Sequence, residues 1–430
     1  MKKSIVLIVI CFTARKATVA QNKVPVNPRV LISTDIGGTD PDDNQSMAHL
    51  LMYSNEFALE GLVSSPSYGN GSKEEILRMI DLYAKDLPAL WAHAKGFPTP
   101  GYLRSICKQG VRRAAPYAGF AAPTEGSRWI IHCAKKASPQ PLWILVWGGL
   151  DDLAQALHDA PEIQDRIRVY FIGGPNKKWC VNSYAYIARN FPDLWLIESN
   201  ATFTGMFTDD QAPAELKKAS YYDNWIKGHG FLGTDFKNYY KGEPKMGDTP
   251  SLLYMMDGDP NHPEKESWGG SYIPFSRSPR RVFDRDLTVQ DTVPVYSVIE
   301  LILKGPVLDL AKDSPCFKMD VHAGIGLQSW PGYYLGAGLY GIRYSPKKAE
   351  KLAYEIRSDL PGFQNRKGSF VVRNKWPGKR DPQNYALGNH WFTDRPDPDL
   401  FCGYSQGART VQKWRNAFLK DWAKRWSWLK

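Results

Sequence analysis

A chain of 430 residues is long enough for two or three domains, and its 43% hydrophobic and 23% charged residues are typical of a folded protein. This composition excludes a disordered chain, a coiled coil and a small disulfide-stapled scaffold, and the sequence lacks an apolar run of the ~18 residues that a membrane-spanning helix needs. Much of the net charge of +11 lies near the two ends of the chain rather than on a broad basic face, which argues against a nucleic-acid partner.

The first twenty residues have the pattern of an export signal. Lys2 and Lys3 precede an apolar stretch over residues 5–12, and small residues at 17–20 offer a cleavage site. We therefore expect a secreted or periplasmic protein, with a short N-terminal membrane anchor as the alternative.

From residue 28 to about residue 200, short apolar runs alternate with longer amphipathic ones. We expect strands at residues 29–35, 59–66, 142–148, 167–174 and 194–198, and helices at 43–53, 73–85, 150–158 and 183–190. Strands that are apolar along their whole length, separated by helices, predict a parallel sheet that is covered on both faces. Such sheets place their ligand sites at the carboxyl ends of the strands.

Polar residues follow four of these strands. Asp35 comes after the first strand, and a Gly-Gly-Leu-Asp-Asp turn carrying Asp151 comes after the third. Asn176 follows the fourth strand, and the fifth runs into Glu198 and Asn200. Because the carboxyl ends of parallel strands share one edge of the sheet, we expect these groups to converge there.

The loop after the first strand is unusually acidic. Asp35, Asp40, Asp42 and Asp43 lie within nine residues, and carboxylates so close together repel one another unless a cation lies among them. Oxygen ligands without His or Cys favour Ca²⁺, with Mg²⁺ as the second choice. Helix capping is the alternative for one or two of these residues, because aspartate stabilises a first helical turn.

This stretch, S-T-D-I-G-G-T-D-P-D-D at residues 33–43, resembles the D-x-D-x-G-x-D-D motif of nucleoside hydrolases. The resemblance implies that Asp35 is a metal-binding catalytic base and that Asp42 and Asp43 are metal ligands, whereas Ser33 replaces the family's first Asp. The longer loop is similar to the nucleoside-hydrolase-like domain of secreted, polysaccharide-associated bacterial proteins, some described as cellulose-binding. That similarity covers residues 28–275 and 385–430 and includes the motifs GGPNKKW, ESNATF, GHGFLG, GDTPSLLYMMDGDP and SWGGSY.

The resemblance implies further site residues. The GGLDD turn matches one whose backbone carbonyl binds the metal, which makes Asp151 the carbonyl donor. The family's late His-Asp pair, a general acid and a metal ligand, matches Gly247 and Asp248, so the acid is missing. His229 is the substitute that we would test, and a structural histidine is the alternative. Asn176, Glu198 and Asn200 are candidate ligands for sugar hydroxyls, and four tryptophans are candidate stacking platforms or core residues: Trp147, Trp179, Trp268 and Trp330.

The pattern changes near residue 291 to short strands separated by Gly, Pro and Asp, which is typical of a β-sandwich. G-L-Y-G-I-R-Y-S-P and Y-E-I-R-S-D-L-P-G resemble an Ig-like module found beside some glycoside hydrolases. The expected fold class is therefore α/β, a doubly wound and mainly parallel sheet with an inserted small antiparallel β-sandwich. The expected segments are a signal peptide at 1–20, α/β parts at 28–285 and 385–430, and the insert at 291–375.

The leading hypothesis is an exported, Ca²⁺-dependent glycosidase in which metal-activated water cleaves a glycosidic bond of a carbohydrate. A non-catalytic glycan-binding protein on the same scaffold is the second hypothesis, because Gly247 occupies the acid's position. A nucleoside N-ribohydrolase is the third. The sequence leaves open whether the protein is a homodimer.

Overall fold

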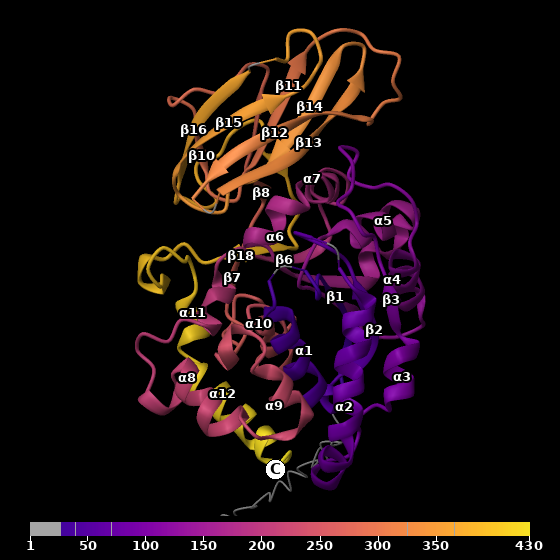
Figure 1. The fold of residues 1–430 in the computed structure, drawn as a ribbon, viewed down its shortest axis with the longest axis vertical. Helices are drawn as coiled ribbons and strands as arrows, with labels where there is room; N and C mark the ends of the chain where they lie inside the picture. Colours follow the sequence, from indigo (N-terminus) through magenta and orange to yellow (C-terminus); the bar gives the residue numbers. More distant parts are fainter. Residues whose placement is uncertain (1–26, 39, 70, 325, 365) are drawn as a thin grey trace, which may run out of the picture.

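The computed structural model describes residues 27–38, 40–69, 71–324, 326–364 and 366–430. The expected signal peptide and the anchor alternative lie outside these residues. Within them, no helix is long and apolar enough to cross a membrane. Two eight-stranded sheets dominate the fold, and Figure 1 shows the second sheet lying above the α6 and α7 end of the first.

The first sheet, here called the α/β sheet, has the strand order β3-β2-β1-β4-β5-β6-β18-β7. Neighbouring strands of this sheet pair in parallel, except that β18 and β7 pair antiparallel to each other. The strands are β1 (Arg29–Thr34), β2 (Ala58–Ser64), β3 (Cys107–Gln109), β4 (Leu142–Val146), β5 (Ile167–Ile172), β6 (Trp195–Ser199), β7 (Tyr272–Pro274) and β18 (Trp391–Asp394).

Both faces of this sheet are buried, as the continuous apolar strands predict. Alternate residues of one strand enter different cores: Leu31 and Ile144 lie in one, whereas Val30 and Leu145 lie in the other. The first core includes residues of α4 (Glu125–Lys135), α5 (Asp151–Asp159) and α7 (Val181–Asn190). The second includes residues of α1 (Asp42–Met52), α2 (Lys73–His93), α9 (Gly230–Phe236), α10 (Thr249–Met256) and α12 (Arg415–Ser427). The doubly wound α/β architecture is therefore confirmed.

The second sheet, here called the β-rich region, has the order β10-β16-β15-β12-β13-β14-β11-β9. Its pairs are antiparallel except at the two edges, where β10 runs parallel to β16 and β9 runs parallel to β11. The strands are β9 (Arg280–Phe283), β10 (Thr292–Pro294), β11 (Val298–Lys304), β12 (Pro315–Ala323), β13 (Gly326–Gly336), β14 (Leu339–Tyr344), β15 (Lys351–Arg357) and β16 (Lys367–Arg373).

An antiparallel β region is thus confirmed, and it is one continuous sheet that curls on itself. Ile299 and Ile342 from one half line the same internal space as Tyr354 and Phe370 from the other, which gives the region a barrel-like form. The sequence placed residues 280–283 in the first α/β part, but they form β9 at the edge of this sheet. The long strand β13 was not expected.

The C-terminal segment returns to the α/β sheet. Its strand β18 pairs in parallel with β6, so the sheet contains strands from both sides of the β-rich region along the chain. Phe418, Trp422 and Trp426 of α12 are buried in the second core, as their four-residue spacing predicts. The shorter helices of the α/β part are α3 (Pro100–Ser105), α6 (Gly174–Trp179), α8 (Lys218–Tyr221) and α11 (Arg409–Gln412).

Candidate functional site

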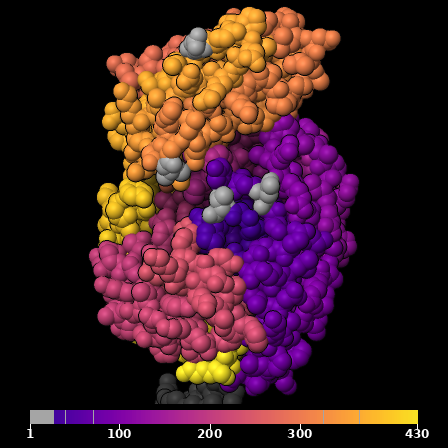
Figure 2. All heavy atoms as spheres, viewed as in Figure 1, coloured from indigo at the N-terminus to yellow at the C-terminus, as the bar shows by residue number. Residues whose placement is uncertain are grey.

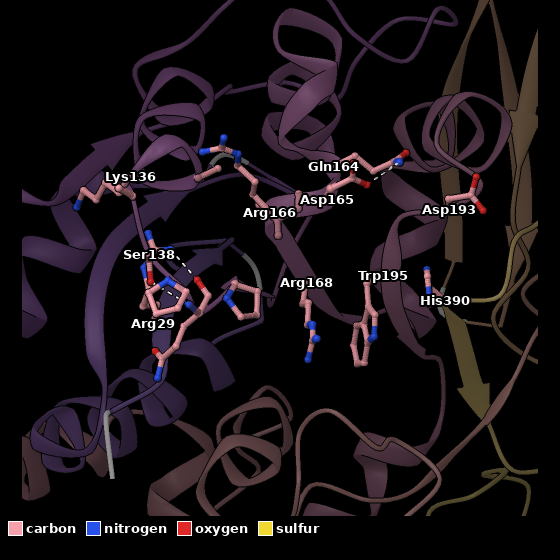
Figure 3. Close-up of a pocket in the computed structure, with 16 residues that line it drawn as sticks. Arg29, Lys136, Ser138, Gln164, Asp165, Arg166, Arg168, Asp193, Trp195 and His390 are labelled. Atoms are coloured by element: carbon pink, nitrogen blue, oxygen red, sulfur yellow. Dashed lines mark hydrogen bonds between the residues drawn. The ribbon is translucent and has the colours of Figure 1, made fainter. Parts of the chain in front are cut away.

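One cavity, of about 650 Å³, lies at the amino edge of the α/β sheet. Figure 3 shows Arg29, Arg168, Trp195 and His390 around it. Its basic groups have partners: Arg29 pairs with Glu60 at 2.6 Å, and the Arg168 guanidinium lies 5.1 Å from the Trp195 ring centroid. Ligand sites of parallel sheets form at the other edge, so this cavity is not the primary candidate.

The second cavity, about 420 Å³, lies at the carboxyl edge, where the sequence places the polar turns. Asp35 after β1, Trp147 after β4 and Asn176 after β5 all line it. Two residues of the β-rich region, Gln328 and Lys347, complete the lining. Figure 2 shows this face of the molecule hollowed beneath the β-rich region, around indigo residues of the N-terminal part.

Three buried carboxylates meet in this cavity. Asp42 and Asp43 begin α1, Asp248 directly precedes α10, and their ligand oxygens lie within 4.8 Å of one another. Each therefore lies at a helix N-terminus, where the helix dipole favours negative charge. Asp35 lines the same cavity, so the structure brings four of the predicted acids together.

Burial is the largest influence on these four carboxyl groups. Burial raises the pKa of Asp35 to about 6, although the hydrogen bond from Ser67 acts to lower it. Burial also raises the pKa of Asp42 to about 7, although the positive charge of Lys245 acts to lower it. Burial followed by the charge of Asp248 raises the pKa of Asp43 well above its usual value, and burial followed by the charge of Asp42 does the same for Asp248. Lys245 supplies positive charge beside the cluster, with its Nζ 3.3 Å from Asp42 Oδ2 and 2.6 Å from Asp40 Oδ2, but it does not cancel the effect of burial on the pKa of Asp42 or Asp248.

The donor set fits a hard divalent cation. The Thr34 hydroxyl donates to Asp43, the Ser67 hydroxyl donates to Asp35, and the Gly247 N–H donates to Asp42 Oδ2 at 3.0 Å, so one oxygen of each group is fixed. Asp248 Oδ2 is buried and has no hydrogen-bond partner among the residues that the structure describes. Buried carboxylate oxygens held in this way can ligate Ca²⁺ or Mg²⁺.

Gly247, which the sequence resemblance aligns with the family's acid, lies tightly against Asp42. A Cβ atom built on it would lie 2.5 Å from Asp42 Oδ2, closer than side-chain atoms approach one another. The close approach allows the backbone N–H of Gly247 to bind that oxygen directly. Gly247 is therefore part of the local packing of the acidic cluster.

Two predicted residues lie away from the cavity. Asp151 Oδ1 accepts hydrogen bonds from the backbone N–H of Ala115 at 2.7 Å and from the Ser183 hydroxyl at 2.8 Å, and the residue begins α5. His229 directly precedes α9, and its Nδ1 lies 3.1 Å from the carbonyl oxygen of Lys227. Neither residue lines the acidic cavity, so the structure does not bring the expected carbonyl donor or the substitute acid to it.

Glu198 and Asn200 form a buried support behind the cavity. Glu198 pairs with Lys177 at 2.8 Å, both side chains being fully buried, and it accepts a hydrogen bond from Asn200 Nδ2 at 2.9 Å. Asn200 Oδ1 in turn accepts from the N–H of Gly174, at the start of α6. Their polar groups are thus engaged within the protein rather than toward a sugar.

Of the remaining candidates, Asn176 reaches the cavity, and its amide donates to the carbonyl oxygen of Trp147 at 2.7 Å. Trp268 instead packs against Phe418 of α12, with ring centroids 6.4 Å apart. Trp179 lines the cavity and packs between Tyr68, at 4.4 Å, and Trp330, at 4.9 Å between ring centroids.

Sequence reasoning missed several groups of the cavity lining: Ser67, Tyr68, Lys178, Tyr240, Gln328 and Lys347. Ser67 and Tyr68 follow β2, so the rule that led to Asp35 and Asn176 also applied to them. Lys178 lies in the GGPNKKW motif, but Tyr240, Gln328 and Lys347 carry no local signal because they come from segments that are distant in the sequence.

The fold and the acidic site together define a nucleoside hydrolase-like α/β protein. Residues 29–272 match the family described as cellulose-binding Sde182, nucleoside hydrolase-like domain, and the chain belongs to this family. Residues 292–359 match a domain of unknown function, DUF5060.

Among solved structures, a nucleoside hydrolase-related hypothetical protein from Saccharophagus degradans, associated with carbohydrate metabolism, has the same fold. It is 21% identical over 81% of this chain and 100% of that chain, with a TM-score of 0.50. An inosine-uridine preferring nucleoside hydrolase from Bacillus anthracis is 15% identical over 59% of this chain and 86% of that chain, with a TM-score of 0.38. A putative glycoside hydrolase from Bacteroides vulgatus is 27% identical over 20% of this chain and 16% of that chain, with a TM-score of 0.18. No curated protein matches the chain.

Proposed function

We propose that this protein is an exported, Ca²⁺-dependent glycoside hydrolase that acts on a carbohydrate. The observation that carries the proposal is the meeting of three buried carboxylates within 4.8 Å, in a cavity that Asp35 also lines. Membership of a cellulose-binding family supports a carbohydrate as the partner.

Asp42, Asp43 and Asp248 would hold the cation, because their oxygens converge and Asp248 Oδ2 has no partner among the described residues. Hard oxygen donors favour Ca²⁺, with Mg²⁺ as the second choice. When bound, the cation would supply positive charge that lowers the pKa of a nearby water and orients sugar hydroxyls.

Asp35 is the proposed general base. The Ser67 hydroxyl donates to its Oδ2 and so fixes the carboxylate, and burial raises its pKa to about 6, which strengthens it as a proton acceptor near neutral pH. Asp35 would take a proton from the water that attacks the anomeric carbon, the bond from that carbon to the leaving oxygen would break, and the leaving oxygen would take a proton from solvent water. Asn176 lines the same cavity and would bind a sugar hydroxyl.

Two exposed tyrosine rings are the proposed stacking surfaces for sugar. Tyr68 is 47% exposed and Tyr240 is 37% exposed, and both line the cavity. A ring with a free apolar face at the mouth of a polar cavity can pack against the C–H face of a sugar. Trp268 is not part of this proposal because it packs in the core beside α12.

The test is sugar release from a panel of polysaccharides by the wild-type protein, with and without a chelator. Asp35→Asn should abolish release while leaving the melting temperature within a few degrees, whereas undiminished release by this variant would refute the assignment of the base. Inosine and uridine belong in the same panel, because release of free base would show a nucleoside N-ribohydrolase instead.

Gly247 favours a second candidate, a glycan-binding protein without catalysis. Gly247 has no side chain and therefore offers no proton donor for the leaving group, and a Cβ added there would lie 2.5 Å from Asp42 Oδ2. Binding of a glycan at the cavity, together with the absence of released sugar across the panel, would establish this function in place of hydrolysis.

Export is part of the proposal and rests on the Lys-Lys and apolar pattern of residues 1–20. Mass spectrometry of the protein expressed in a bacterium should find a mature chain that begins near residue 21 outside the cytoplasm. A cytoplasmic protein that retains residues 1–20 would contradict it.

A further inference from the structure

Lys178 is a buried cation in the wall of the acidic cavity. It lies near the end of α6, its residue surface is only 2% exposed, and its ammonium group donates to Gln328 of the β-rich region. The same ammonium lies 5.0 Å from the ring centroids of Trp179 and Trp330. Lysines are almost never so deeply buried without a partner of opposite charge.

The structure provides no such partner for Lys178. Among the described residues, Lys245 forms ion pairs with Asp40 and Asp42, whereas Lys178 and Lys347 form none within 4.0 Å. Glu350 acts on both ammonium groups and Asp40 acts on that of Lys347, each from beyond that distance. Two lysines of one cavity therefore have no carboxylate in contact.

Lys347 belongs to the loop after β14 and is exposed, yet it lines the same cavity. Its charge is close enough to act on Lys178: burial, followed by repulsion from Lys347, lowers the pKa of Lys178 to about 8. Two ammonium groups that line one cavity without a carboxylate in contact can bind an anion.

The two lysines without a carboxylate in contact and the acidic cluster come from different elements of the fold, although Lys245 and Asp40 also act on Lys347. Asp42 and Asp43 begin α1, and Asp248 directly precedes α10. Lys347 belongs to the β-rich region, and Lys178 contacts that region through Gln328. A neutral sugar would supply hydroxyl groups for the aspartates and a bound cation, but nothing that compensates the two ammonium groups. A sugar that carries a carboxylate or a sulfate would supply both.

We propose that the glycan bound at this site is anionic, and that Lys178 and Lys347 bind its carboxylate or sulfate group while Gln328 positions Lys178. This inference rests on the proposed function insofar as it takes the ligand to be a glycan. It assigns the β-rich region a direct part in substrate selection, through Lys347, which follows the last of the acids, Asp248, by 99 positions in the sequence.

The test measures binding rather than turnover, by calorimetry on the full-length mature chain with Ca²⁺ present and with Asp35→Asn to prevent hydrolysis. One arm uses a tetramer of galacturonic acid and its methyl ester, which has the same linkages without charge. The other uses a sulfated galactan tetrasaccharide and its desulfated form. The inference predicts that the charged member of at least one pair binds at least tenfold more tightly than its neutral counterpart, and the arm in which this occurs identifies carboxylate or sulfate.

Substitution then locates the contact. Lys347→Met should weaken binding of the charged ligand about threefold, since the side chain is exposed, and Lys178→Met should weaken it about tenfold or more. Neither variant should change the affinity for the neutral ligand. Lys348→Met is the matched control, because it removes the same charge from the adjacent exposed residue, which does not line the cavity. Since Lys347 is exposed, its variant tests the inference even if Lys178→Met fails to fold.

Equal affinity for charged and neutral ligands, binding of neither charged ligand, or equal effects of Lys347→Met and Lys348→Met would overturn the inference. These outcomes do not depend on whether the protein hydrolyses a glycan. A protein that binds charged glycans through the lysines without cleaving any glycan would refute the proposed hydrolysis and support this inference. Cleavage of neutral glycans alone would support the hydrolysis and refute this inference.

Discussion

The behaviour of the acidic site follows from how few positive charges face four buried carboxyl groups. Asp43 and Asp248 each have a raised pKa because burial removes water and because a neighbouring carboxylate repels the second charge. In the absence of a cation the protein therefore stores unfavourable electrostatic energy at this site, and a divalent cation would convert repulsion into attraction.

Asp43→Asn tests this electrostatic balance. We expect the variant to melt at a higher temperature than the wild type in a chelator, because one repelling charge is gone. In saturating Ca²⁺ the order should reverse, because the wild type gains about 2.7 kcal/mol at a Ca²⁺ concentration 100 times the dissociation constant. Thermal unfolding with and without Ca²⁺ measures both effects.

Asp151→Asn is the matched control, because Asp151 is a buried acid that bonds Ala115 and Ser183 outside the cavity. Its Ca²⁺-dependent stabilisation should equal that of the wild type. An undiminished Ca²⁺ response in Asp43→Asn would show that the cation, if it binds, does so elsewhere.

A second residue-scale prediction concerns Gly247. In Gly247→Ala the new methyl group would lie 2.5 Å from Asp42 Oδ2, so the carboxylate must move. We expect a Ca²⁺ affinity at least tenfold lower by calorimetry, with the fold retained. Gly101→Ala, where no atom lies within 4 Å of the added Cβ, should leave the affinity unchanged; equal affinities in all three proteins would contradict the packing argument.

At the scale of elements, strands and their turns were the predictable part of the fold. Asp35, Asp42 and Asn176 were found from the sequence because they follow apolar strands and because the carboxyl ends of such strands share an edge. The same rule failed for Glu198 and Asn200, which lie at the end of β6 but turn inward to a buried lysine. Adjacency in sequence to a strand end places a residue at the edge and does not decide which way its side chain points.

His229 and Trp268 show a different limit. Both lie in loop motifs outside the strand pattern, and their positions depend on how α9 and α12 pack against the sheet. Lys178, Gln328 and Lys347 could not be grouped from the sequence at all, because their meeting depends on how the β-rich region packs onto the α/β sheet.

The packing of α12 on α1 predicts a pH dependence of stability. His49 of α1 is buried, stacks on Tyr53 at 4.6 Å and lies 5.3 Å from Trp422 of α12. Burial and then the charge of Arg425 lower its pKa to about 3. The unfolded chain binds a proton at His49 below about pH 6.5 while the folded chain does not, so this contribution to stability is complete above pH 6.5 and is lost as the pH falls toward 3.

Between pH 7 and pH 5 the expected loss from His49 is about 2 kcal/mol in the free energy of unfolding. Urea unfolding at several pH values measures it, and His49→Leu should have a shallower decline over this range even if its stability at pH 7 differs. Parallel declines in the two proteins would show that the histidine can be protonated in the folded state.

At the scale of the whole molecule, the β-rich region is joined to the α/β part by a buried polar network. Glu300 pairs with Arg343 at 2.7 Å, and Arg343 donates to the carbonyl oxygen of Tyr117 at 2.6 Å. The Arg343 guanidinium also lies 3.6 Å from the centroid of the Tyr117 ring, which belongs to the α/β part. This network holds the region that supplies Gln328 and Lys347 to the cavity.

Glu300→Gln should therefore loosen the contact between the two parts. Removing one charge leaves the buried Arg343 uncompensated, which costs about 3 kcal/mol. Hydrogen exchange should show faster exchange in β14 and around Tyr117 than in β4. Glu355→Gln, which breaks a surface pair with Lys367, should cost less than about 1 kcal/mol and leave that exchange unchanged; similar effects of both variants would contradict the role given to the network.

The central claim is that aspartates from two distant parts of the chain hold one divalent cation at the carboxyl edge of the α/β sheet. Anomalous diffraction from crystals of the full mature chain soaked in Ca²⁺ tests it most directly. The account predicts one ion at about 2.4 Å from oxygens of Asp42, Asp43 and Asp248. An empty site at saturating Ca²⁺, or an ion bound by other residues alone, would contradict it.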